Sequence, residues 1–202
     1  ALRAEIERYL IDTFCSKTEG KWKNDWLKPC IPADINTITA DEKKLVDSGF
    51  YKYCCSYPEK RDYICPVCYL LGARGLVGFL STPFLYIETG SISRLQFIRM
   101  DRVIGTSARG KYGALGKYEV IPDEVKFTGD MIILEKDDIL GWELGKARPI
   151  TESKGDKWLE DTQWNKEKVV RELIEDRFKN IQLLGGFKSK GCGEVQISIS
   201  KA

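Results

Sequence analysis

Apolar residues recur at helical spacing in two stretches of the chain. From Ala1 to about Phe14 the steps are three and four residues, which gives one apolar face and predicts an amphipathic helix. A second helix is predicted from Lys166 to about Asn180, with Asn165 as its N-cap. The apolar residues of the second helix that share one face are Val169, Val170, Leu173, Ile174 and Phe178.

The remaining apolar residues form short runs or alternate with polar residues, as is typical of strands. The expected strands are Leu76 to Leu80, Phe84 to Glu88, Ser93 to Arg102, Tyr118 to Ile121, Glu124 to Glu135 and Glu194 to Lys201. With one more strand expected before Ala1, the order becomes βαββαβ. This order predicts an α+β, ferredoxin-like (RRM-like) fold, in which two helices cover one antiparallel sheet.

We predict a single domain over 1–202. Three stretches within it lack the periodicity of helices and strands. Residues 15–63 form an irregular insertion with one short helix candidate, Ala40 to Asp47. Residues 103–117 are rich in glycine and basic residues and predict a β-hairpin finger. Residues 144–165 are polar and predict a loop.

Composition narrows the class of protein. Of 202 residues, 43% are hydrophobic and 31% charged, which is typical of a globular protein with a core. The net charge of +2 sums 32 basic and 30 acidic groups, so a nucleic-acid surface requires local segregation of charge. An odd cysteine count without a secretory signal disfavours a disulfide scaffold. No apolar run approaches the roughly 20 residues of a membrane span, and we expect a cytoplasmic protein without membrane contact.

The cysteines predict a structural metal site. Cys65-Pro66-Val67-Cys68 places two thiolates on one tight turn, at the spacing that a tetrahedral ion such as zinc requires. Cys30 and either Cys54 or Cys55 could complete the site, and we favour Cys55. An insertion as irregular as 15–63 has little core of its own, and a bound metal ion would stabilise it. The alternative is a set of free thiols in a reducing compartment.

Two basic, glycine-rich stretches are candidates for contacts with RNA. Glycines allow backbone N–H groups to approach a phosphate, while basic and aromatic side chains supply charge and a stacking surface. The candidates are Arg102, Arg109, Lys111, Tyr112 and Lys117 in the finger, and Lys188, Ser189, Lys190 and Gly191 near the C-terminus. Arg3, at the start of the first helix, is a further candidate for a phosphate contact. The alternatives are solvated turns and a solvated helix charge.

Several segments resemble, in order, the RAMP superfamily of CRISPR-associated proteins, and most closely the backbone subunit of type III effector complexes. The resemblance is carried by Ala1 to Glu7, Cys65 to Ala73, Asp101 to Gly105, Tyr118 to Pro122 and Leu184 to Val195. The chain departs from the family pattern at Val120, where the family has arginine, at Tyr69, where a basic residue is usual, and in the long gap between the first helix and the knuckle.

The resemblance implies a subunit that holds guide RNA and target RNA by phosphate and shape contacts, beside other effector subunits and copies of itself. In this family a metal-assisted aspartate cuts target RNA with Mg or Mn, and its position would fall upstream of Ala1. The chain has no histidine for acid–base catalysis, and we assign no catalytic residue. The alternatives are a metal-stabilised protein-interaction subunit and another RAMP subunit without nuclease activity.

Overall fold

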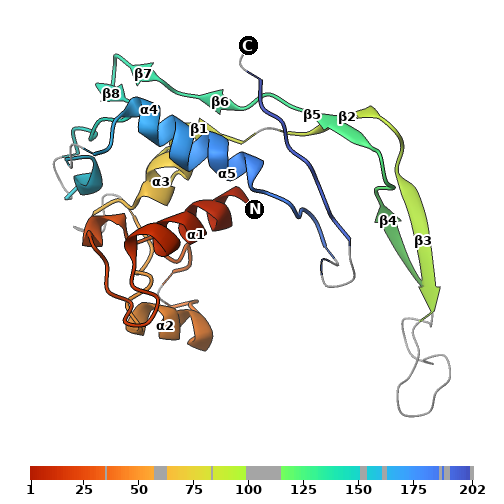
Figure 1. Ribbon diagram of the computed structural model, residues 1–202, viewed down its shortest axis with the longest axis horizontal. Coiled ribbons are helices and arrows are strands. Elements are labelled where there is room, and N and C mark those ends of the chain that lie inside the picture. Colours follow the sequence, from red (N-terminus) through yellow and green to blue (C-terminus); the bar gives the residue numbers. More distant parts are fainter. Residues whose placement is uncertain are drawn as a thin grey trace. The chain divides into compact units, whose positions relative to one another are not determined.

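The computed structural model describes residues 1–34, 36–56, 63–82, 84–98, 115–150, 154–160, 163–186, 188 and 192–200. The chain forms two compact units (Figure 1). The first unit comprises Ala1–Ser81 and Ile133–Ala202, and the second comprises Thr82–Ile132. Among the described residues, no helix combines the length and apolar character needed to cross a bilayer.

The first predicted helix is confirmed as α1, Leu2–Phe14. Leu2, Ile6 and Leu10 are buried on one face, at the four-residue steps read from the sequence. Each buried aliphatic side chain contributes about 1.5–3 kcal/mol relative to an exposed one, so this face fixes the helix in the core.

The second predicted helix is also confirmed, but its middle is a π-helix. It consists of α4 (Lys166–Lys168), the π-helical η3 (Val169–Glu175) and α5 (Asp176–Lys179). The Asn165 side chain accepts a hydrogen bond from the Lys168 N–H at 2.9 Å, as an N-cap does. This helix packs against α1, where the Tyr9 hydroxyl donates to the Glu172 carboxylate at 2.5 Å.

Two short helices lie in the predicted insertion, and a third begins just after it. They are η1 (Asp25–Leu27), α2 (Ala40–Asp47) and α3 (Pro66–Leu71). Helix α2 has the predicted bounds, and Thr39 and Glu42 form a capping box at its start. The eight residues of α2 are all exposed or half-buried, so this helix adds little core. Trp22, Leu27 and Ile31, by contrast, are buried.

Among the described residues the strands form small separate sheets, so the α+β class is confirmed. Each of the four sheets contains two strands. The pairs are β1 (Leu80–Ser81) with β6 (Ile132–Ile133), β2 (Tyr86–Thr89) with β5 (Lys126–Thr128), β3 (Ser93–Ile98) with β4 (Leu115–Val120), and β7 (Lys136–Asp137) with β8 (Trp142–Glu143).

The expected strand from Glu194 to Lys201 is not formed over its described residues, 194–200. Glu194 makes one bridge to Leu183, and the Val195 N–H donates to the Gln182 carbonyl at 2.8 Å. From Val195 onward the side chains alternate between half-buried and exposed, as the sequence pattern requires. Alternation fixes which side chains face the core, but a strand also needs a neighbouring backbone to pair with.

The second unit is a two-stranded antiparallel ribbon, which we call the arm (82–132; Figure 1). Strands β3 and β4 pair in continuous register from Ser93 opposite Val120 to Ile98 opposite Leu115. Strands β2 and β5 also pair antiparallel, with a register irregularity within their own pairing between Ile87 and Thr89. The arm extends well beyond the predicted finger, of which Lys117 lies in β4 and residues 103–114 lie outside the described residues.

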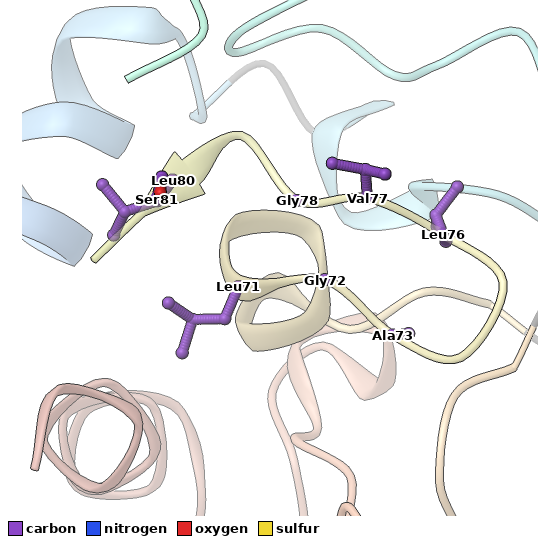
Figure 2. A pocket seen from close by; sticks show the side chains of 8 residues that line it. All are labelled: Leu71, Gly72, Ala73, Leu76, Val77, Gly78, Leu80 and Ser81. Atoms are coloured by element: carbon purple, nitrogen blue, oxygen red, sulfur yellow. The ribbon is translucent and has the colours of Figure 1, made fainter. Parts of the chain in front are cut away.

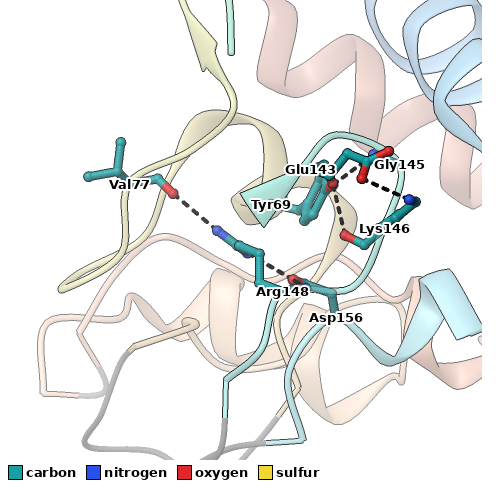
Figure 3. Close-up of polar contacts among 7 residues, drawn as sticks. All are labelled: Tyr69, Val77, Glu143, Gly145, Lys146, Arg148 and Asp156. Atoms are coloured by element: carbon teal, nitrogen blue, oxygen red, sulfur yellow. Dashed lines mark hydrogen bonds and ion pairs between the residues drawn. The ribbon is translucent and has the colours of Figure 1, made fainter. Parts of the chain in front are cut away.

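The polar stretch 144–165 contributes to the core of the first unit. The side chains of Arg148 and Asp156 are fully buried and form an ion pair at 2.8 Å (Figure 3). Arg148 also donates to the Val77 carbonyl at 3.1 Å, and its guanidinium lies 4.9 Å from the centre of the Tyr69 ring. Trp158 from the same stretch is fully buried. Although residues 144–165 are mostly polar, side chains from this stretch are therefore packed in the core of the first unit.

Candidate metal centre

Four buried cysteines converge in the first unit. The sulfur atoms of Cys30, Cys55, Cys65 and Cys68 all lie within 4.8 Å of one another. Their exposed fractions are at most 6%. These are the four cysteines that the sequence singled out, and Cys55 occupies the position for which Cys54 was the alternative.

Helix α3 positions the first two sulfurs. Cys65 is its N-cap and Pro66 its first residue, which is the turn that a Cys-Pro-x-Cys sequence favours. The Cys68 backbone N–H donates to Cys65 Sγ at 3.5 Å, and the Cys65 N–H donates to Cys55 Sγ at 3.4 Å. Backbone N–H groups directed at sulfur stabilise thiolates, because they place positive dipoles beside the negative charge.

A short parallel pairing of two backbone segments brings the other two sulfurs to the same place. Cys30 bridges to Lys52, with the Lys52 N–H donating to the Pro29 carbonyl at 2.9 Å and the Ile31 N–H to the Lys52 carbonyl at 3.0 Å. Cys55 follows Lys52 by three residues and reaches the cluster from this segment. The predicted insertion therefore supplies half of the cysteines.

The four thiols strongly perturb one another. Cys30 Sγ and Cys68 Sγ are 3.3 Å apart. Hydrogen bonds from the thiols of Cys55, Cys65 and Cys68 lower the pKa of Cys30. Burial raises the pKa of Cys65, and the hydrogen bond to Cys30 raises that of Cys68. The pKa of Cys55 is lowered on balance: its hydrogen bond with Cys30 raises the pKa, while those with Cys65 and Cys68 lower it.

The donor set fits a single tetrahedral metal ion. With metal–sulfur bonds of about 2.3 Å, the edges of a tetrahedron of sulfurs are about 3.8 Å. The longest sulfur–sulfur separations would shorten by at most about 1 Å to reach this geometry, and the 3.3 Å between Cys30 and Cys68 would lengthen by about 0.5 Å. Four thiolates select soft or borderline metals such as zinc or iron, and they leave no coordination position for a substrate. The cluster could therefore hold a metal ion in a closed site.

The other predicted site residues are dispersed. Lys117 is exposed on β4 of the arm, and Lys188 is exposed near the C-terminus. Arg3 lies beside the cysteine cluster, where its Nη2 donates to the Cys30 carbonyl at 2.7 Å. The remaining RNA-contact candidates lie outside the described residues: Arg102, Arg109, Lys111, Tyr112, Ser189, Lys190 and Gly191.

Sequence reasoning missed two buried cations, Lys52 and Arg148. The adjacent sequence gives little sign of either, because lysine and arginine are mostly exposed unless they are paired. Lys52 precedes the Cys54-Cys55 pair closely in the chain, which is the one available hint that it belongs to the metal centre.

A pocket lies where α3 gives way to β1, lined by residues between Leu71 and Ser81 (Figure 2). The loop after Gly72 folds back, and Gly78 packs closely against the Leu70 carbonyl and the Gly72 nitrogen. The eight described residues that line this pocket carry no ionisable side chain. None of these eight side chains can therefore act as a general acid or base at neutral pH.

Comparison of the sequence with models of known protein families finds no match. Comparison with curated proteins finds no relative.

Proposed function

We propose that this chain is an RNA-binding subunit of a type III CRISPR ribonucleoprotein, built around a structural zinc centre. The observation that carries the proposal is the arm, 82–132, with its exposed aromatic and basic side chains. The ordered resemblance to the RAMP superfamily supplies the class of partner. The partners are guide RNA and target RNA, together with other effector subunits and further copies of the chain.

The arm has the chemistry of a surface for single-stranded RNA. Tyr86 and Phe84 are 68% and 85% exposed. Lys117 and Lys126 are exposed on the same ribbon. A two-stranded ribbon cannot bury either face by itself, so these side chains are free for a partner. Aromatic rings that stack on bases and cations that contact phosphates do not distinguish between RNA sequences. A subunit that must accept guide RNAs of any sequence needs contacts of this kind.

The zinc centre has a structural role in this proposal. Zinc held by Cys30, Cys55, Cys65 and Cys68 would tie the insertion to the start of α3. The loop that follows α3 leads into β1, which immediately precedes the arm. In fold we propose the ferredoxin-like plan of the superfamily. Cleavage of target RNA with Mg or Mn would need the aspartate that the family carries upstream of Ala1, and we place no catalytic residue in this chain.

The test of RNA binding is a set of charge substitutions in the chain. Lys117→Gln and Lys188→Gln should each weaken binding of a single-stranded RNA, measured by fluorescence anisotropy at low salt. Lys43→Gln on α2 is the control, because Lys43 is an exposed lysine of the first unit, as Lys188 is, and is not an RNA-contact candidate. If all three variants bind RNA with the affinity of the unchanged protein, Lys117 and Lys188 do not contact RNA and the proposal is refuted for these two residues.

A second candidate is a metal-stabilised subunit that binds protein through the arm. Several large apolar side chains of the arm are more than half exposed, among them Phe84, Ile92 and Ile121. Such side chains are typical of a protein interface. This candidate predicts a folded, zinc-loaded chain with no affinity for RNA, and the same anisotropy measurement distinguishes it.

The metal is tested by elemental analysis of protein purified without chelator. We expect about one equivalent of zinc, because a four-thiolate site binds one ion. Less than about half an equivalent of any metal would rule out the centre, whereas one equivalent of iron would keep the site and change the ion.

A further inference from the structure

A zinc ion held by four thiolates carries a net charge of −2, because each ionised cysteine contributes one negative charge. In this chain the four cysteines are buried. Burial of uncompensated charge is costly, so a buried dianionic centre needs cations or dipoles near its sulfurs. Among the described residues, the cationic side chains of Arg3 and Lys52 lie beside the cluster and contact groups that its cysteines also contact or carry.

Arg3 approaches the cluster at Cys30. Its Nη2 donates to the Cys30 carbonyl at 2.7 Å and lies 3.6 Å from Cys30 Sγ. Its Nε forms an ion pair with Glu7 at 2.8 Å, one turn further along α1. The guanidinium is thus fixed on both sides: the carboxylate orients one edge, and the other edge faces the cysteine. The Arg3 side chain is 25% exposed, and solvent screens its charge only in part.

Lys52 and Cys55 share one neighbour, the backbone carbonyl of Tyr63. It is 9% exposed, and its ammonium donates to the Tyr63 carbonyl and lies 3.7 Å from the centre of the Tyr63 ring. Cys55 Sγ is 3.8 Å from the same carbonyl oxygen. An ionised Cys55 can no longer donate to that oxygen, and the ammonium then offsets the repulsion between the two negative atoms.

We propose that Arg3 and Lys52 are positioning residues of the metal centre, which compensate its negative charge and set its affinity for zinc. Arg3 acts at Cys30 and Lys52 at Cys55, the two ligands that the insertion supplies. The other two ligands, Cys65 and Cys68, lie at the start of α3. There a backbone N–H stabilises the negative charge, because the Cys68 N–H donates to Cys65 Sγ. This inference rests on the proposed zinc centre.

The experiment measures zinc affinity of the whole chain by competition with a chromophoric chelator. We expect Arg3→Met and Lys52→Met each to weaken zinc binding about 10–100-fold, the usual effect of losing an outer-shell partner. The control variants are Arg8→Met and Lys44→Met. Arg8 is an exposed arginine of α1 paired with Glu5, and Lys44 is an exposed lysine of α2 paired with Asp41. Both controls should bind zinc as the unchanged protein does.

A spectroscopic measurement separates compensation of charge from loss of packing. With cobalt in place of zinc, loss of the Arg3 contact should move the sulfur-to-cobalt charge-transfer band to lower energy, because a hydrogen bond to sulfur stabilises its lone pairs. Arg8→Met should leave the band unchanged. The charge-conserving variants Arg3→Lys and Lys52→Arg should retain most of the zinc affinity, and they remain informative when a methionine variant does not fold.

The outcomes are distinguishable from failure of the zinc centre itself. When the unchanged protein binds no metal, the centre is wrong. When it binds zinc and both methionine variants bind within threefold of it, the role of Arg3 and Lys52 is refuted. Equal losses in the methionine and charge-conserving variants would also refute it, because charge would then not be the property that matters.

Discussion

The contribution of the buried ion pair between Arg148 and Asp156 to the stability of the first unit can be tested quantitatively. Asp156 accepts from the Arg148 backbone N–H at 3.0 Å, from Nε at 2.8 Å and from Nη2 at 2.8 Å. Both side chains have no solvent exposure. Asp156→Ala leaves the guanidinium buried without its counter-ion, a change that costs about 3–5 kcal/mol.

The remaining contacts of Arg148 place the expected cost at the lower end of that range. The guanidinium keeps its hydrogen bond to the Val77 carbonyl and its position over the rings of Tyr69 and Trp142, at 4.9 and 5.2 Å. We therefore expect Asp156→Ala to lower the free energy of unfolding by about 3 kcal/mol, and the melting temperature by about 6 to 12 °C.

Tryptophan fluorescence during thermal and urea unfolding is the assay. All five tryptophans lie in the first unit, so the signal reports on the unit that contains the ion pair. Glu160→Ala is the control, because the neighbouring Lys157–Glu160 pair is 37% and 58% exposed and should contribute less than about 1 kcal/mol. The double variant Arg148→Met, Asp156→Leu should recover stability relative to Asp156→Ala, since it leaves no unpaired charge. Equal costs for Asp156→Ala and Glu160→Ala would refute the reasoning.

Three further tests address local features. Cys55→Ser should abolish stoichiometric zinc binding and Cys54→Ser should preserve it, as measured by elemental analysis, because Cys54 does not belong to the four-sulfur cluster; equal zinc content would contradict this assignment. Asn165→Ala should cost about 1 kcal/mol in urea unfolding, since the Lys168 N–H loses its cap; no change would contradict the capping role. Gly78→Ala should destabilise the first unit by about 1–3 kcal/mol or more, because a Cβ would lie 2.2 Å from a backbone oxygen, whereas Gly186→Ala meets nothing within 4 Å and should be near neutral.

Features that depend on local sequence were predictable. The spacing of Leu2, Ile6 and Leu10 identifies the buried face of α1, because a helix repeats its environment within a single segment. Asn165 was identifiable as a cap for the same reason. The Cys-Pro-x-Cys turn identified Cys65 and Cys68 as two members of the cysteine cluster. Because few other cysteines were available, the remaining two members could be chosen as Cys30 and either Cys54 or Cys55.

Features that depend on pairing between distant segments were not predictable. The alternation after Glu194 indicated a strand, but backbone pairing among the described residues ends with the Glu194–Leu183 bridge and the hydrogen bond from Val195 to Gln182. The polar composition of 144–165 indicated a loop, and nothing in the sequence shows that Arg148 and Asp156 face each other inside the core. Arg3 resembles a surface charge of α1, and its contact with Cys30 joins residues far apart in the sequence.

The most direct test of the proposed function is the affinity of the zinc-loaded chain for two unrelated single-stranded RNAs, measured against salt concentration. We predict equal affinities for the two sequences and a linear fall of the logarithm of the association constant with the logarithm of salt, with a slope of about −2, as expected for about three phosphate contacts. Absence of binding at low salt, or binding that does not change with salt, would contradict an RNA-binding function for this chain.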